Sequence, residues 1–139
     1  MSELLEKARS YEAKKIAATD KESKPLFHIS APAGWINDPN GFSVYNGKIH
    51  LFYQYYPYLR EWGPMHWGHS TTSDMIKWEQ LPCVLAPDEE YDKKGCFSGS
   101  AIEADGKHVL VYTGVTRIKL PDGSEQERQN QCIAFGRRT

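Results

Sequence analysis

Two similar stretches, Gly41–Tyr53 and Gly99–Tyr112, constrain the fold of this chain more than any other feature of its sequence. In each stretch, short β-prone runs flank a polar pair that ends in glycine, Asn46-Gly47 in the first and Asp105-Gly106 in the second. Such pairs favour two-residue β-hairpin turns, because asparagine, aspartate and glycine adopt positive φ angles at low cost. A repeated hairpin of this kind favours an all-β fold built from similar antiparallel units.

Three further β-prone runs complete the pattern. His66–Ser73 and Lys77–Leu81 follow the first hairpin, and Asn130–Phe135 follows the second after a polar loop. Counted as four-stranded antiparallel units, the runs make about one and three-quarter propeller blades. The repeat alone also fits two hairpins of a β-sandwich. Because a closed ring takes about four to eight blades, the sequence predicts a partial propeller whose last strand is an open edge.

The first twenty residues differ from the rest of the chain. They contain no glycine or proline, place charged pairs at helical spacing and offer Ser2 as an N-cap, so they predict a short α-helix over residues 3–17. Propensity alone leaves such a helix marginal, so it must dock on another element or fray. The polar stretch from Asp20 to Pro25 predicts a linker that allows the helix to move, and the helix is expected to be dispensable for chemistry. The predicted organisation is a helix and linker start at 1–20 and a truncated β-propeller domain at 25–139.

The charge balance and the distribution of apolar residues exclude several classes of protein. Lysine and arginine number 17 and aspartate and glutamate 18, whereas a nucleic-acid-binding protein would show a basic excess. No segment approaches the ~18 consecutive apolar residues of a transmembrane helix, and the N-terminus lacks the apolar core of a secretory signal. The 3 cysteines include no CxxC pair, which favours reduced thiols in a cytoplasmic protein.

The segment Ala33–Gly41, AGWINDPNG, is the most distinctive in the chain. Pro39 holds Asp38 extended, and Pro39-Asn40-Gly41 predicts a turn. Taken alone, the segment favours a structural Asx-turn over a functional carboxylate. Trp35 and the aromatic and polar clusters downstream favour a sugar site instead, because rings cover the C–H faces of a sugar while polar groups bond its hydroxyls.

Other chemically versatile residues favour structural roles. His66 and His69 are three residues apart on a predicted strand, so they should point to opposite faces and not share a metal. No glycine-rich phosphate loop of the P-loop or dinucleotide type occurs. The cysteines lack a neighbouring base, and Trp67 and Trp78 are expected in the core between strands.

The order and spacing of the aromatic and polar motifs resemble glycoside hydrolase family 32, which contains invertases, sucrose-6-phosphate hydrolases and inulinases. The motifs are Trp35-Ile-Asn-Asp38-Pro-Asn-Gly41, Phe52-Tyr-Gln54-Tyr55, Glu61-Trp62-Gly63-Pro64, Trp67-Gly-His69, Trp78 and Phe97-Ser98-Gly-Ser100. The likeness covers about residues 25–135. It implies a five-bladed β-propeller followed by a β-sandwich, and retaining hydrolysis of β-fructosides such as sucrose without a metal or cofactor.

The resemblance also implies roles for individual residues. Asp38 matches the nucleophile that attacks the anomeric carbon of the fructosyl unit. Substrate-binding positions fall on Trp35, Asn37, Gln54, Trp62, Phe97 and Ser98. Retaining chemistry further needs a protonated carboxyl about 5–5.5 Å from the nucleophile. The implied partner is a small sugar, and the sequence leaves open whether it is sucrose, sucrose 6-phosphate or a fructan, and whether water or an alcohol accepts the fructosyl group.

The chain departs from the family in one respect. The family's Arg-Asp-Pro segment and the Glu-Cys segment that carries the general acid/base do not occur in these 139 residues. The remaining carboxylates, none in a matching setting, are Glu61, Asp74, Asp88, Glu89, Glu90 and Asp92. Two hypotheses follow: the N-terminal part of a cytoplasmic β-fructofuranosidase, or a non-catalytic sugar-binding fragment. Either one is expected to self-associate non-specifically through its open strand edge, with no nucleic acid or membrane partner.

Overall fold

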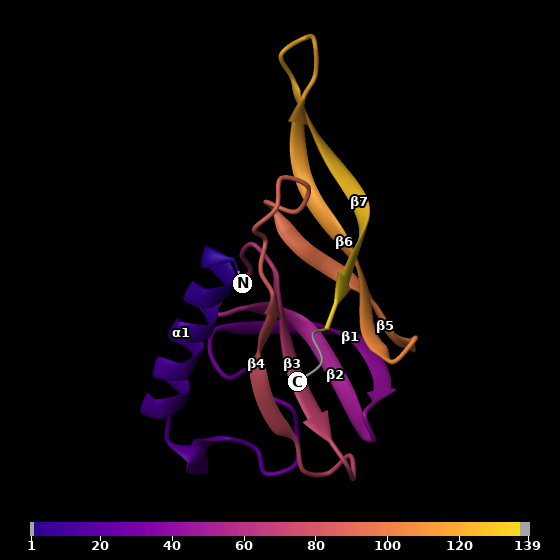
Figure 1. Cartoon of the computed structure of the whole chain (residues 1–139). Helices are drawn as coiled ribbons and strands as arrows, with labels where there is room; N and C mark the ends of the chain where they lie inside the picture. The colour runs from indigo at the N-terminus through magenta and orange to yellow at the C-terminus, as the bar shows by residue number, and fades with distance from the viewer. Residues whose placement is uncertain (1, 137–139) are drawn as a thin grey trace.

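The computed structural model describes residues 2–136 and divides them into two antiparallel sheets and one α-helix (Figure 1). In chain order the elements are α1 (Glu3–Ala18), the 3-10 turn η1 (Lys21–Ser23), β1 (Trp35–Tyr45), β2 (Lys48–Tyr56), β3 (His66–Thr72), β4 (Glu79–Leu85), β5 (Gly95–Ala104), β6 (Lys107–Lys119) and β7 (Glu125–Phe135). The all-β prediction with a short N-terminal helix is therefore confirmed. The described part of the chain contains no helix long and apolar enough to cross a membrane.

Both predicted hairpin turns are confirmed. Asn46 and Asp105 have φ angles of 49° and 50°, and each precedes a glycine that also has a positive φ. The first turn joins β1 to β2 and the second joins β5 to β6. Each sheet follows the chain in sequence, β1-β2-β3-β4 and β5-β6-β7, which is the up-and-down order of propeller blades.

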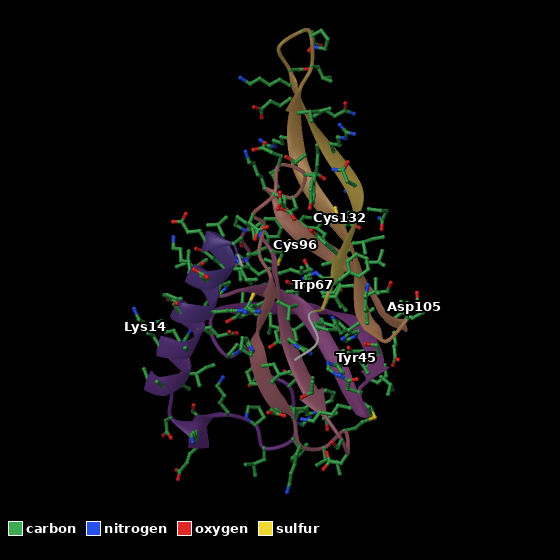
Figure 2. All side chains as sticks on the ribbon, viewed as in Figure 1. Lys14, Tyr45, Trp67, Cys96, Asp105 and Cys132 are labelled. Carbon is green, nitrogen blue, oxygen red and sulfur yellow. The ribbon has the colours of Figure 1, made fainter. Side chains whose placement is uncertain are left out.

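The main core lies between the two sheets, where β1 runs beside β5 (Figure 1). Its buried side chains are Phe52, Trp67, Cys96, Leu110, Tyr112 and Cys132. Figure 2 labels Trp67, Cys96 and Cys132 in the region where the sheets meet. The expectation for Trp67 is confirmed, since its side chain is fully buried, whereas Trp78 lies half-buried before β4 and outside both core clusters.

The turn predicted at Pro39-Asn40-Gly41 is wrong, because these residues lie inside β1. Pro39 pairs with Tyr53 and Asn40 with Phe52, and the register of β1 shifts on both sides of this pair. Such shifts mark β-bulges, where a proline without an N–H and a glycine at φ 53° are both accommodated. The residue types that suggested a turn instead bend a continuous strand.

Helix α1 is fixed to the edge of β4. Ser2 caps the helix by accepting a hydrogen bond from the Leu5 N–H at 3.2 Å, as predicted. One turn further on, Arg9 Nε donates to the Cys83 carbonyl at 2.7 Å, and the Cys83 N–H donates to the Glu12 carboxylate at 3.1 Å. Glu12 is only 2% exposed. The prediction of a freely moving helix is therefore wrong.

Strand β7 has a free edge in the described part of the chain, because it pairs only with β6. The β6–β7 hairpin also extends beyond the rest of the molecule (Figure 1). Ile133 and Phe135 on β7 are 61% and 63% exposed. Unpaired backbone groups beside exposed apolar side chains favour pairing with another chain.

We accordingly expect the 139-residue chain to self-associate with rising concentration. Ile133→Lys should weaken the association by at least about tenfold, because a charge on an edge strand opposes strand pairing. Ile76→Lys is the matched control, since Ile76 is 59% exposed but lies outside the strands. Sedimentation velocity measures both variants. A strictly monomeric parent chain would contradict the prediction.

Three buried histidines lie at one end of the contact between the sheets. The Tyr45 carbonyl can only accept, so His50 Nε2–H donates to it at 3.1 Å, and the neutral His50 ring then has Nδ1 free to accept from His69 Nε2–H at 2.9 Å. His108 Nε2 lies 2.9 Å from Ser43 Oγ, which donates its own proton to a carbonyl, so His108 is the donor there. The bond between His50 and His69 requires a neutral His50 ring, because a protonated His50 would have no lone pair on Nδ1.

The stability of the fold should therefore fall in mild acid. Burial, together with the charge of the neighbouring His50, lowers the pKa of His69 to about 3 and that of His108 to about 4. At a pH between the unfolded-state pKa near 6.5 and these lower pKa values, the unfolded chain binds protons that the folded chain does not. This difference lowers the free energy of unfolding by about 2 kcal/mol at pH 5 for His69 alone. Above pH 6.5 this loss disappears.

Urea unfolding at pH 7.5 and pH 5 measures the effect. His69→Gln should reduce the drop in the unfolding midpoint, whereas His28→Gln, at an exposed position, should leave the drop unchanged. The comparison between variants also removes the opposite contribution of Glu12, whose pKa burial raises. An identical pH dependence in all three chains would contradict the assignment.

Candidate active site

Asp38 is exposed on β1, at the place where this strand meets the second sheet. Its Oδ2 accepts a hydrogen bond from Ser98 Oγ of β5 at 3.3 Å. Both residues sit at register shifts, between Ile36 and Pro39 in β1 and between Phe97 and Gly99 in β5. Bulges redirect side chains relative to a regular strand, and here the two bulges present a carboxylate and a hydroxyl to one another and to solvent.

Two aromatic rings, those of Trp62 and Phe97, contact each other, and Phe97 lies next to Ser98 in the sequence of β5. Trp62, in the loop between β2 and β3, is 55% exposed. Its ring meets the Phe97 ring edge-on, with centroids 6.1 Å apart and planes at 88°. Phe97 directly precedes Ser98 in β5, at the register shift that also includes Ser98. A combination of aromatic rings and polar groups suits a sugar, which has both C–H faces and hydroxyl groups.

Asn37 is oriented by Trp35. The indole Nε1–H of Trp35 donates to Asn37 Oδ1 at 2.8 Å. This bond uses the amide oxygen, so the Asn37 NH₂ group is left to donate to another acceptor. Both side chains are half-buried and lie in the first three residues of β1, immediately before Asp38.

The Gln54 side chain lies in the interior, whereas a side chain that binds a ligand is expected at the surface. Its side chain is 3% exposed, and Nε2 donates to the Cys96 carbonyl at 2.9 Å. Beside it, Trp67 Nε1–H donates to the Phe97 carbonyl at 3.1 Å. These two bonds from the first sheet hold consecutive carbonyls of β5 immediately before Ser98. Sequence reasoning missed this positioning role of Trp67, since its burial is predictable but its long-range acceptor is not.

Three of the other candidate carboxylates, Asp74, Asp88 and Asp92, are engaged in hydrogen bonds elsewhere. Asp92 is fully buried and accepts hydrogen bonds from the Tyr112 hydroxyl and the Glu89 N–H, both at 2.8 Å, while burial raises its pKa. Asp74 accepts from the N–H groups that follow it, which lowers its pKa, and Asp88 accepts from Ser2. No hydrogen bond in residues 2–136 joins any of these three to Asp38.

A metal site is absent from the part of the chain that the structure describes, since no three His, Cys, Asp or Glu side chains are grouped to hold one. His66 and His69 have separate surroundings, as predicted. His66 Nδ1 bonds the Pro64 carbonyl at 2.9 Å, whereas His69 belongs to the histidine cluster between the sheets. The candidate site thus consists of a carboxylate, a hydroxyl, an amide and two rings at the junction of two sheets.

Comparison with known proteins identifies the family. The model of the glycosyl hydrolases family 32 N-terminal domain matches residues 28–139. The chain belongs to glycoside hydrolase family 32. All residues of the candidate site lie within the matched range, and the resemblance inferred from the motifs is confirmed.

The relatives within family 32 are enzymes that are named for sucrose or fructan chemistry. The chain is 49% identical over 113 residues to the sucrose-6-phosphate hydrolase of Escherichia coli and 48% identical over 134 residues to the levanase of Bacillus subtilis. The match covers 81% and 95% of this chain but 24% and 19% of those proteins. The chain therefore spans about a quarter or less of the length of these relatives.

Solved structures of family 32 share the same fold. The β-fructofuranosidase of Bombyx mori, solved in complex with sucrose, matches 94% of this chain with a TM-score of 0.80 and 44% identity. The sucrose-6-phosphate hydrolase of Lactobacillus gasseri matches 95% of the chain with a TM-score of 0.70 and 35% identity. The chain covers 27% and 25% of those structures.

Proposed function

We propose that this chain is the N-terminal part of a retaining β-fructofuranosidase, with Asp38 as the nucleophile. The observation that carries the proposal is the exposed Asp38 carboxylate, hydrogen-bonded to Ser98 across the junction of two sheets, in a chain of family 32. Residues 25–139 would then form part of a five-bladed propeller, and residues 1–20 a helix docked on its first blade.

The chemistry follows from the carboxylate. Asp38 attacks the anomeric carbon of the fructosyl unit, the glycosidic C–O bond breaks, and a separate carboxylic acid protonates the leaving oxygen. Water then hydrolyses the fructosyl ester and releases Asp38 in its ionised form. The Ser98 hydroxyl fixes the direction of the carboxylate, so its other oxygen is free to attack.

The remaining site residues are assigned to binding. We assign Trp62 and Phe97 to the apolar face of the sugar, and the NH₂ group of Asn37 to a hydroxyl, with Trp35 setting its direction. Gln54 completes the pocket wall by holding β5 in place. The names of relatives support sucrose, sucrose 6-phosphate and fructans as the substrate class.

A second candidate function is sugar binding without turnover. It is favoured by the local engagement of Asp74, Asp88 and Asp92, which leaves them no part in protonating a leaving group bound at Asp38. The family's acid-bearing segment also does not occur in the sequence.

A chimera separates the two functions. Residues 28–139 are placed in the sucrose-6-phosphate hydrolase of Escherichia coli in exchange for the segment that they match. We expect the chimera to release glucose or glucose 6-phosphate at a rate comparable with the parent enzyme. A folded chimera that binds sugar and releases none would support the binding function and overturn the enzymatic one.

A further inference from the structure

A cavity of about 410 Å³ lies between α1, the segment that follows it and the loop after β2. Its lining includes Tyr11, Lys15, Thr19, Lys24, Tyr58 and Arg60. None of these residues belongs to the proposed site around Asp38. The volume is within the range of about 300–1,000 Å³ found for small-molecule pockets.

The cavity lining carries positive charges that no acidic side chain of the lining neutralises. Lys15, Lys24 and Arg60 line it, and no aspartate or glutamate does. None of the three takes part in an ion pair within residues 2–136. A concave wall that gathers cations and excludes carboxylates attracts anions, and an arginine fork can bind two oxygens of a phosphate at once.

Lys24 is the most enclosed of these cations. Its Nζ donates to the Ala31 carbonyl at 2.8 Å and to the Pro32 carbonyl at 3.4 Å, which ties the ammonium group to the segment before β1 and leaves one of its three protons unused. Partial burial lowers the pKa of Lys24, so the charged form is held in an environment that solvates it poorly. A bound anion would supply that missing stabilisation, and the unused proton of the ammonium group can bind one.

Another part of the cavity wall is aromatic. The Tyr11 and Tyr58 rings meet edge-on at 5.1 Å, and the Tyr11 hydroxyl donates to the Tyr58 carbonyl at 3.2 Å. Lys15 Nζ lies 5.4 Å from the centre of the Tyr11 ring. Aromatic faces with hydroxyl and ammonium groups alongside are suited to an organic phosphate whose carbon skeleton can pack on a ring.

We propose that this cavity binds the phosphate monoester of a sugar, with Lys15, Lys24 and Arg60 around the phosphate and Tyr11 and Tyr58 against the sugar. The proposal does not depend on the assignment of Asp38, because the two groups of residues do not overlap. Its predicted ligand is a hexose phosphate, and inorganic phosphate offers the same charge without the sugar.

Isothermal titration of the 139-residue chain with glucose 6-phosphate tests the proposal at low ionic strength. Arg60→Gln and Lys15→Gln should each weaken binding by at least about tenfold, since a charge-assisted bond to phosphate is lost. Lys14→Gln is the matched control: it removes the same charge from α1, but Lys14 lies outside the cavity lining, on the outer side of the helix (Figure 2). Asp38→Asn should leave this affinity unchanged, which distinguishes the cavity from the proposed nucleophile.

Two parallel titrations identify the ligand. Glucose should show no saturable binding, and inorganic phosphate should bind more weakly than glucose 6-phosphate. Equal affinity for inorganic phosphate would overturn the sugar part of the proposal. Absence of saturable glucose 6-phosphate binding, or an equal loss in Lys14→Gln, would overturn the site itself. Circular dichroism of each variant excludes unfolding, and Lys15→Gln, at an exposed position, supplies a second test if Arg60→Gln is unfolded.

Discussion

Asp38→Asn in the Escherichia coli chimera is expected to lower kcat for sucrose by roughly 10⁴–10⁶-fold, the range found when one member of a catalytic unit is removed. The neutral amide cannot form the fructosyl ester, because it lacks the negative charge that attacks the anomeric carbon. The fold should be unaffected, since Asp38 is exposed and an amide oxygen can still accept from Ser98. Glucose release and a binding titration with fructose measure the two properties separately.

Asp105→Asn provides the matched control. Asp105 is an exposed carboxylate in a hairpin turn with φ 50°, and asparagine adopts that conformation equally well. We expect its kcat to equal that of the unchanged chimera. Full activity of the Asp38 variant, or an equal loss in both variants, would remove the nucleophile assignment.

The isolated 139-residue chain should hydrolyse sucrose no faster than buffer. General acid catalysis typically contributes about 10²–10⁴-fold, and the family's acid-bearing segment does not occur in these 139 residues. Three of the remaining carboxylates, Asp74, Asp88 and Asp92, are engaged in other hydrogen bonds. Activity of the short chain that is lost in Asp38→Asn would show that one of its own carboxylates protonates the leaving group.

Trp67→Ala should lower the free energy of unfolding by about 3–5 kcal/mol, as expected when a large aromatic side chain is removed from a packed core. Trp67 is fully buried between the sheets and touches the cluster that joins them. Trp67→Phe should cost about 1–3 kcal/mol, because the ring is kept while the Phe97 carbonyl loses its donor. Urea unfolding of the 139-residue chain gives both values.

Trp62→Ala is the matched control, because it removes the same indole ring from an exposed position. Trp62 is 55% exposed, so we expect a loss below about 1 kcal/mol. Comparable losses for Trp62 and Trp67 would mean that the contact between the sheets does not determine the stability of the chain.

Local sequence was sufficient to predict the hairpins, since a two-residue turn depends on the conformations of the turn residues themselves. Asn46-Gly47 and Asp105-Gly106 carry that information within two positions each. The helix was predictable for the same reason, because its cap and its charged pairs are neighbours in sequence.

The bulge in β1 was not predictable from the same kind of signal. Pro39 and Gly41 serve a turn and a bulge equally well, and the pairing of β1 with Tyr53 and Phe52 decides between them. That pairing depends on packing over the whole sheet, which a local pattern does not contain.

The candidate site was predicted by resemblance, and its geometry comes from contacts distant in sequence. Asp38 and Ser98 come from different sheets, so their hydrogen bond depends on how the sheets stack. The same holds for the amide of Gln54, which the sequence places near a sugar and the structure places on the Cys96 carbonyl.

The hydrogen bonds from α1 to Cys83 affect where another chain can pair with the first sheet. Arg9 and Glu12 occupy the outward carbonyl and N–H that β4 would otherwise offer to a foreign strand. Strand addition at this point of β4 is therefore blocked, whereas β7 keeps an unpaired edge in the described part of the chain.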